Sequence, residues 1–127
     1  MIKQLVCLLA CLVMAGAGAL AHHSYGAYDR DHPLTIEGTI EQLTIGNPHA
    51  ILIVHTDDGQ AFTAEWNSAV QLTRTGFVAG MLTAGDRVIV TGAPSRDPEL
   101  HRLALVSRIA RPRDGWEWTR SGVVTAR

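Results

Sequence analysis

The sequence predicts an all-β domain with one short helix, closed into a small barrel. Three observations carry this prediction. Segments of strand and helix character follow one another in the order strand, strand, strand, helix, strand, strand. The apolar positions of the first strand change phase near Gln42, which indicates a β-bulge and a bent strand. The segment 50–54 is apolar at every position, as expected where a sheet curls and both of its faces are covered.

The first two strands form a hairpin over residues 34–56. Alternating positions of the first strand share one face: Leu34, Ile36, Gly38 and Ile40. Beyond the bulge the apolar phase passes to Leu43 and Ile45. The turn is expected at residues 46–48, Gly-Asn-Pro, because these residue types favour turns. Gly38 and Gly92 are expected to be positions where two backbones approach closely.

A third strand and the helix come next. Asp-Asp-Gly at 57–59 is a turn signal, and residues 60–66 alternate, with Phe62, Ala64 and Trp66 on one face. Asn67 or Ser68 is expected to cap a helix of about two turns that runs to Arg74. Gly76 is placed to end that helix.

Two further strands complete the barrel. The fourth is expected over residues 87–91, closed by Gly92, and a loop follows over 93–100. The fifth is expected over 102–109, with Leu103, Leu105 and Ile109 facing inward. This order is that of the OB-fold, a five-stranded Greek-key barrel. An open antiparallel sheet covered by one helix fits the same order.

The chain divides into four parts. Residues 1–21 have Lys3, a short apolar run and an Ala-Leu-Ala end, which predicts a signal peptide cleaved after Ala21 and a periplasmic or secreted protein. A membrane anchor is disfavoured because the apolar run is too short, and a lipoprotein cleaved before Cys11 ranks second. Residues 22–33 are expected to form an extended lead-in, 34–110 the barrel domain, and 111–127 a turn and a basic tail. Within that tail, 116–118 is expected to be a short edge strand and the last residues to be loose.

Cysteine count and charge exclude some classes of protein. Both cysteines, Cys7 and Cys11, lie within the predicted signal peptide, so the mature chain is expected to have no disulfide and no thiolate chemistry. The mature chain from residue 22 has no lysine and has ten arginines against twelve acidic residues, so its formal net charge is −2. This balance does not suit a nucleic-acid-binding protein.

Several short motifs together resemble a family of small exported bacterial proteins of unknown function. The matching segments are His-His-Ser-Tyr at 22–25, Gly-Thr at 38–39, Asn-Pro-His at 47–49, Glu65, Leu72, Arg74, Gly76, Gly-Asp at 85–86, Gly92 and Arg-Asp-Gly at 113–115. The chain departs from the family pattern at Trp66, Ala69 and Phe77. The resemblance implies export and a small β-rich domain, and it implies no activity.

The predicted cleavage point creates a candidate metal site. Cleavage after Ala21 leaves His22 with a free α-amine beside its imidazole, and these two nitrogens can chelate one ion. Nitrogen ligands of this kind suit Cu(II), and the arrangement resembles the histidine brace of exported copper proteins. A third nitrogen is expected from His23 or His49.

The other histidines are less suited to this role. His49 and His55 lie six positions apart on one strand, about 20 Å at the usual rise, so they cannot bind the same ion. The lead-in is long enough to bring His22 to either end of the barrel. His32 and His101 have no evident partner and are expected to be solvated.

Other polar and aromatic residues have plain structural readings. Glu65 is expected to pair with Arg74 across the short helix, and Gly-Asp at 85–86 is read as a turn. Trp66, Trp116 and Trp118 are read as core or edge cover, with a stacking platform for sugars as the alternative. No nucleophile with a base, phosphate loop or pair of carboxylates is evident, so a binding role is favoured over an enzyme.

Three hypotheses of function follow from these observations. The first is a periplasmic binding module that takes Cu(II) at His22, His23 and His49. The second is a module that binds a protein or glycan without metal, in which residues 116–118 make the contact. The third is an oxidative copper enzyme using the same histidines. No membrane anchor and no nucleic-acid partner are expected after cleavage.

Overall fold

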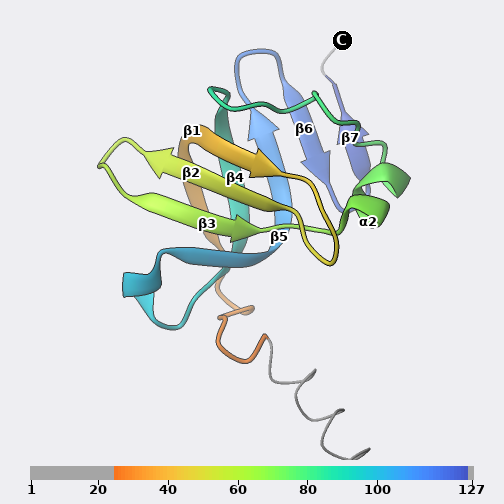
Figure 1. The fold of residues 1–127 in the computed structure, drawn as a ribbon. Coiled ribbons are helices and arrows are strands. Elements are labelled where there is room, and N and C mark those ends of the chain that lie inside the picture. Colours follow the sequence, from red (N-terminus) through yellow and green to blue (C-terminus); the bar gives the residue numbers. More distant parts are fainter. Residues whose placement is uncertain (1–24, 126–127) are drawn as a thin grey trace, which may run out of the picture.

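The computed structural model describes residues 25–125 and confirms a closed five-stranded barrel (Figure 1). The barrel strands are β1 (Leu34–Thr44), β2 (Ile51–Thr56), β3 (Ala61–Glu65), β4 (Arg87–Pro94) and β5 (Arg102–Arg111). The helix α2 (Ala69–Arg74) lies between β3 and β4, and a single 3₁₀ turn, η1 (Pro98–Leu100), precedes β5. Two further strands, β6 (Trp116–Thr119) and β7 (Gly122–Val124), extend the sheet beyond β5.

The strand order closes the sheet into a barrel. Antiparallel neighbours run β3-β2-β1-β4-β5, and a short parallel pairing of β3 with β5 joins the two ends. This is the pairing expected of the OB-fold, and the open-sheet alternative is therefore wrong. The bulge predicted near Gln42 is present, because the register between β1 and β2 shifts between Ile40 and Gln42.

Close approach of strands explains two of the glycines. A Cβ on Gly38 would lie 2.2 Å from the carbonyl oxygen of His55, and a Cβ on Gly92 would lie 2.9 Å from that of Ala104. Only glycine fits at either position without a shift of the neighbouring backbone. The reading of Gly38 and Gly92 as close-approach positions is confirmed.

The core has two parts, an aliphatic interior of the barrel and an aromatic cluster that includes residues of β6. The aliphatic part consists of buried side chains from all five strands, among them Ile40, Leu52, Val54, Val88, Val90, Leu103, Val106 and Ile109. In the aromatic part, the Trp66 ring lies 5.0 Å from Phe77 and 4.9 Å from Trp118, both edge to face. Trp116 and Trp118 are also buried, so these indoles are core residues rather than an exposed stacking surface.

The helix begins and ends where the sequence predicts. Ser68 is its N-cap and forms a capping box with Gln71, in which each side chain bonds the backbone N–H of the other residue. The chain leaves the helix after Thr75 through Gly76, which has φ +82°. The side chain of Trp118 donates a hydrogen bond of 2.9 Å to the Thr75 hydroxyl, which ties α2 to β6.

Several predictions about the second half of the barrel are wrong. Gly92 does not end the fourth strand, which continues to Pro94. Leu105 does not face inward. It has φ +50° and lies half-buried in a bulge of β5, and Val106 occupies the core in its place. The segment beyond residue 119 is not loose up to 124, because it forms β7 and pairs with β6.

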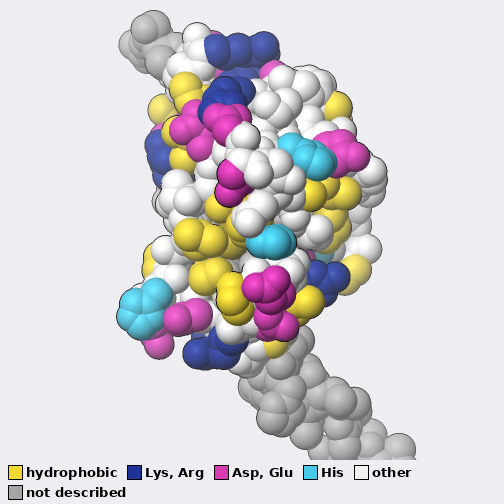
Figure 2. Space-filling model, turned by 90° about the vertical axis from the view of Figure 1, so that its left-hand side faces the viewer, with side chains coloured by type: hydrophobic (Ala, Val, Ile, Leu, Met, Phe, Trp, Pro, Cys, Tyr) yellow, Lys and Arg dark blue, Asp and Glu magenta, His cyan; other side chains and the backbone are white. Residues whose placement is uncertain are grey.

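Part of the basic charge that follows Arg102 is neutralised by ion pairs. Arg108 pairs with Glu117 at 2.7 Å across β5 and β6. Arg111 lies between two carboxylates, Asp86 at 2.8 Å and Asp114 at 2.9 Å. The face shown in Figure 2 likewise has acidic and basic side chains next to one another rather than in separate areas. Among residues 25–125, no helix has the length and apolar character needed to cross a membrane.

Candidate functional site

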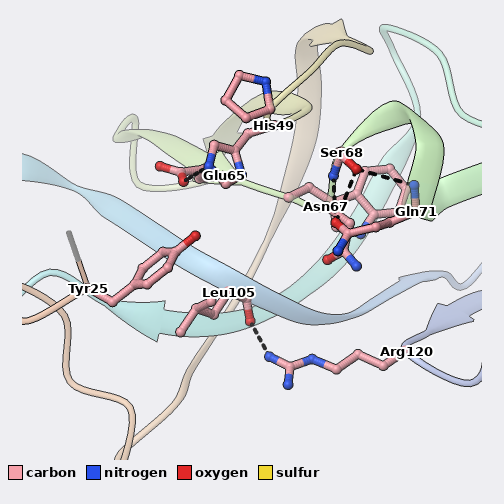
Figure 3. Close-up of a pocket in the computed structure, with 10 residues that line it drawn as sticks. Tyr25, His49, Glu65, Asn67, Ser68, Gln71, Leu105 and Arg120 are labelled. Atoms are coloured by element: carbon pink, nitrogen blue, oxygen red, sulfur yellow. Dashed lines mark hydrogen bonds and ion pairs between the residues drawn. The ribbon is translucent and has the colours of Figure 1, made fainter. Parts of the chain in front are cut away.

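A pocket of about 560 Å³ lies beside the start of β2, the end of β3 and the bulge of β5. Most of the residues that line it have a polar group: Tyr25, Pro48, His49, Glu65, Trp66, Asn67, Ser68, Gln71, Leu105 and Arg120. Figure 3 shows His49 and Glu65 together on one side, the residues of the α2 N-terminus on another, and Leu105 with Arg120 opposite. The lining comes from segments far apart in the sequence, so the pocket exists only in the folded chain.

His49 is positioned by the corner that leads into β2. The next residue, Ala50, is buried, donates its N–H to the Asn67 carbonyl and accepts from the N–H of Trp66. This pairing fixes the backbone beside His49, whose imidazole Nε2 lies 3.2 Å from Oε1 of Glu65. Both side chains are about one-third exposed, so ligands can reach them from solvent.

The predicted pairing of Glu65 with Arg74 is wrong. Glu65 is at the end of β3, opposite Ile51 of β2, and this register places it beside His49. Arg74 lies in the last turn of α2 and forms no ion pair within residues 25–125. The short sequence separation between Glu65 and Arg74 favours a local pair. The pairing of β3 with β2 instead places His49, at the start of β2, beside Glu65.

Tyr25, the first residue that the structure describes, also lines this pocket. It lines the same cavity as His49, and its hydroxyl end points toward the cavity (Figure 3). The segment that follows is anchored by a bridge between Tyr28 and Ser95 and by the N–H of Asp29, which donates to the Pro94 carbonyl at 2.8 Å. The lead-in therefore folds back against the end of β4 and delivers Tyr25 to the pocket.

Leu105 and Arg120 form the opposite wall. The left-handed backbone of Leu105 interrupts the ladder between β4 and β5, where the register shifts between Thr91 and Ala93. Arg120, in the turn from β6 to β7, donates a hydrogen bond of 3.2 Å to the Leu105 carbonyl. Neither residue was a candidate from the sequence, because nothing local marks Leu105 as a bulge or places Arg120 near it.

Trp66 contributes a buried donor to the same region. Its indole N–H is buried and has no hydrogen-bond partner among the described residues. A buried donor in this state usually has a water or another group as its partner. Trp66 thus lines the pocket and also packs in the aromatic cluster.

The remaining histidines have partners elsewhere. His55 contacts Glu41 at 2.5 Å, at the far end of β2 from His49, which agrees with the prediction that the two cannot share an ion. His32 is solvated as predicted, with its side chain 84% exposed, whereas His101 is half-buried, and each has a neighbour that the sequence did not indicate. His32 lies 3.0 Å from Asp29, and the ring of His101 packs edge to face on Phe62 with centroids 5.2 Å apart.

The predicted metal ligands are only partly within the described chain. His22 and His23 lie outside residues 25–125, so their placement is not described. Within those residues, no group of three or more histidine, cysteine, aspartate or glutamate side chains is arranged to hold a metal ion. His49 with Glu65 is therefore a pair that needs a further ligand group from elsewhere to make a metal site.

Comparison with known proteins identifies one match. The family described as "Family of unknown function (DUF6152)" matches residues 9–104, which include the lead-in and nearly all of the barrel up to the start of β5. No curated protein matches the chain.

Proposed function

This chain belongs to the DUF6152 family, whose function is unknown, and we propose that it is a small exported binding module that takes Cu(II) beside His49. In this proposal the signal peptide is cleaved after Ala21. His22 then supplies its α-amine and imidazole, and His49 or His23 supplies a further imidazole nitrogen. The assignment to export and to copper is ours and rests on the donor chemistry and the geometry that follow.

One observation carries the proposal: Tyr25 and His49 line the same pocket. His22 precedes Tyr25 by three residues, so its backbone lies within about 11 Å of that of Tyr25. An N-terminus that begins at residue 22 is thus within reach of His49 without any rearrangement of the barrel. The same argument disfavours His55, which lies at the other end of β2.

The pocket residues fit a nitrogen-ligated metal. A histidine that binds a metal commonly donates its other ring N–H to a carboxylate, which orients the ring. Glu65 is positioned for this task, 3.2 Å from Nε2 of His49, and leaves Nδ1 as the ligand atom. An α-amine and two imidazoles together favour Cu(II) over harder cations such as Mg²⁺ and Ca²⁺.

The test is a titration of the exported protein with Cu(II), after mass spectrometry has established its first residue. We expect cleavage before His22 and one tightly bound Cu(II), with nitrogen ligands visible by electron paramagnetic resonance. Adding four residues before His22 should abolish the tight site, because the α-amine moves too far away to chelate with that imidazole. A single added residue is unsuitable, because a new amine close to two histidines could form another copper chelate.

His49→Gln identifies the third ligand. Loss of an outer-shell partner alone typically costs about 10- to 100-fold in metal affinity, so loss of a ligand should cost no less. His55→Gln is the matched control on the same strand and should bind Cu(II) as the parent does. Equal affinity in His49→Gln would remove His49 from the site, and a mature chain that begins elsewhere would refute the whole proposal.

A further inference from the structure

A second hollow, of about 470 Å³, lies on the other side of the β5 bulge. Its lining residues come from the lead-in, the end of β4, the bulge and the β6–β7 turn: Arg30, Pro33, Gly92, Ala93, Leu105, Ser107 and Arg120. Leu105 and Arg120 line this hollow and the pocket beside His49, so the two cavities are neighbours. Nothing in the proposed copper site uses Arg30, Ser107 or the hollow itself.

The bulge makes this hollow. Between the pairs Thr91 with Arg108 and Ala93 with Ala104, β4 has one residue while β5 has three. Val106 points into the core and is fully buried, whereas Leu105 and Ser107 are half-buried and line the hollow. A left-handed leucine is a sparsely populated backbone state, and such states are often retained at binding sites.

Arg30 and Arg120 are two of the five arginines within residues 25–125 that form no ion pair, and they are the two that line this hollow. Four arginines form ion pairs with carboxylates: Arg87, Arg108, Arg111 and Arg113. Within residues 25–125, neither Arg30 nor Arg120 forms an ion pair, and Arg120 instead donates to the Leu105 carbonyl. Each guanidinium has five N–H donors, so most of the donors of Arg120 remain available to a ligand.

The acidic residue before Arg30 in the sequence, Asp29, does not pair with the Arg30 guanidinium. Asp29 is engaged by His32, and it also accepts the backbone N–H of Asp31. Arg30 itself is held beside the hollow because the backbone of Asp29 is bonded to the end of β4. The lead-in and the β6–β7 turn thus present one guanidinium each to the same cavity.

Between the two arginines, part of the lining is aliphatic and can contact a carbon skeleton. Pro33, Ala93 and Leu105 supply aliphatic surface, and the Ser107 hydroxyl is a single neutral polar group. Guanidinium groups bind carboxylates in charge-assisted pairs, and cavities of this size accommodate small organic molecules. We propose that this hollow binds a small organic carboxylate, with Arg30 and Arg120 on the carboxylate and the aliphatic residues on its carbon chain.

Sodium octanoate is the probe for this proposal, titrated into the isotope-labelled full-length exported protein and followed by nuclear magnetic resonance. We expect saturable shifts of the backbone amides of Gly92, Leu105 and Ser107. Arg30→Gln and Arg120→Gln should each weaken binding by about tenfold, because each removes a charge-assisted hydrogen bond. Arg74→Gln is the control, since this exposed arginine lines neither cavity, and it should leave the affinity unchanged.

Two comparison ligands make the test decisive. Octanamide, which keeps the chain but not the charge, should bind at least about tenfold more weakly; equal binding would overturn the role of the arginines. Inorganic phosphate should also bind more weakly, because it has no carbon chain, and equal binding would overturn the organic part of the proposal. Arg30→Gln should keep its Cu(II) affinity, because Arg30 does not line the pocket beside His49, and this separates the proposal from the copper proposal.

Discussion

Two charged regions on opposite sides of β5 use arginine in different ways. At the Asp86 corner, Arg111 and Arg113 both bind one buried carboxylate, and Arg111 also binds Asp114 and the Met81 carbonyl. At the bulge, Arg30 and Arg120 face an open hollow and meet no carboxylate among the described residues. The first arrangement fastens the loop after α2 to the strands, whereas the second leaves charge available to a ligand.

The difference shows that residue type does not reveal the role of an arginine in this chain. Asp86 has a side chain only 5% exposed, and it receives Nη1 of Arg111, Nη2 of Arg113 and the backbone N–H of Thr83. Such a cluster is costly to disturb because Asp86 and Arg111 are both largely buried. The open side has few buried charges, so substitutions there should affect binding more than stability.

The largest effect is expected from Asp86→Ala at the closed corner. Removing this carboxylate leaves the largely buried Arg111 with only the exposed Asp114, and we expect a loss of about 3 kcal/mol or more in the free energy of unfolding. Asp114→Ala is the control and should cost much less than Asp86→Ala, because its side chain is 45% exposed. Urea denaturation measures both. A loss below 1 kcal/mol for Asp86→Ala would show that the corner does not fasten the loop.

The next effect distinguishes two adjacent residues of the bulge. Val106→Ala should cost about 2 kcal/mol, because it removes two methyl groups from a fully buried side chain. Leu105→Gly should stay within about 1 kcal/mol of the parent, because relief of the left-handed backbone offsets the lost contacts and the freedom of glycine. Equal losses in the same denaturation experiment would mean that Leu105 belongs to the core after all.

The smallest effect concerns the exposed pair between β5 and β6. The hydrogen bond that Arg108 donates to Glu117 lowers the pKa of that carboxyl below its ordinary value of 4.5. A lowered pKa stabilises the fold above about pH 4.5, and this contribution disappears as the pH falls through the folded-state pKa. Glu117→Gln should therefore lose up to about 1 kcal/mol at pH 7, and its difference from the parent should shrink below pH 4.5.

Thermal unfolding of Glu117→Gln and the parent between pH 7 and pH 3 measures this change. Glu99→Gln is the matched control, because Glu99 is exposed and has no ion pair within residues 25–125. A difference between Glu117→Gln and the parent that stays constant down to pH 3 would contradict the assigned pKa.

Much of the fold could be predicted because its signals are local. The phase change at Gln42, the capping residue Ser68 and the helix-ending Gly76 each mark their structure within a few residues, and all three are where the sequence placed them. The order of the elements then specified the barrel type, since few arrangements close five strands with one helix after the third. Trp116 and Trp118 are buried, which agrees with the prediction of core or edge cover and not with a stacking platform for sugars.

The candidate site could be predicted only in part. His49 was chosen from the Asn-Pro-His corner and does line a pocket, but its neighbour Glu65 was assigned to Arg74. An unbroken alternation along β5 predicts that Leu105 lies in the core, but the bulge shifts that alternation. The sequence does not indicate Arg120, because it predicts that the last residues are loose. The pairing of β6 with β7 instead brings Arg120 to Leu105.

By itself, the sequence determined the strand segments, the bent first strand, the helix and its ends, and the type of barrel, because periodicity, capping and turn chemistry act over a few residues. Only the tertiary structure decided which charges meet and which stay free. Strand register and the β5 bulge set those distances, and they depend on pairing between segments that lie tens of residues apart. Asp86 with Arg111, His49 with Glu65, and the open hollow at Arg120 all follow from that pairing.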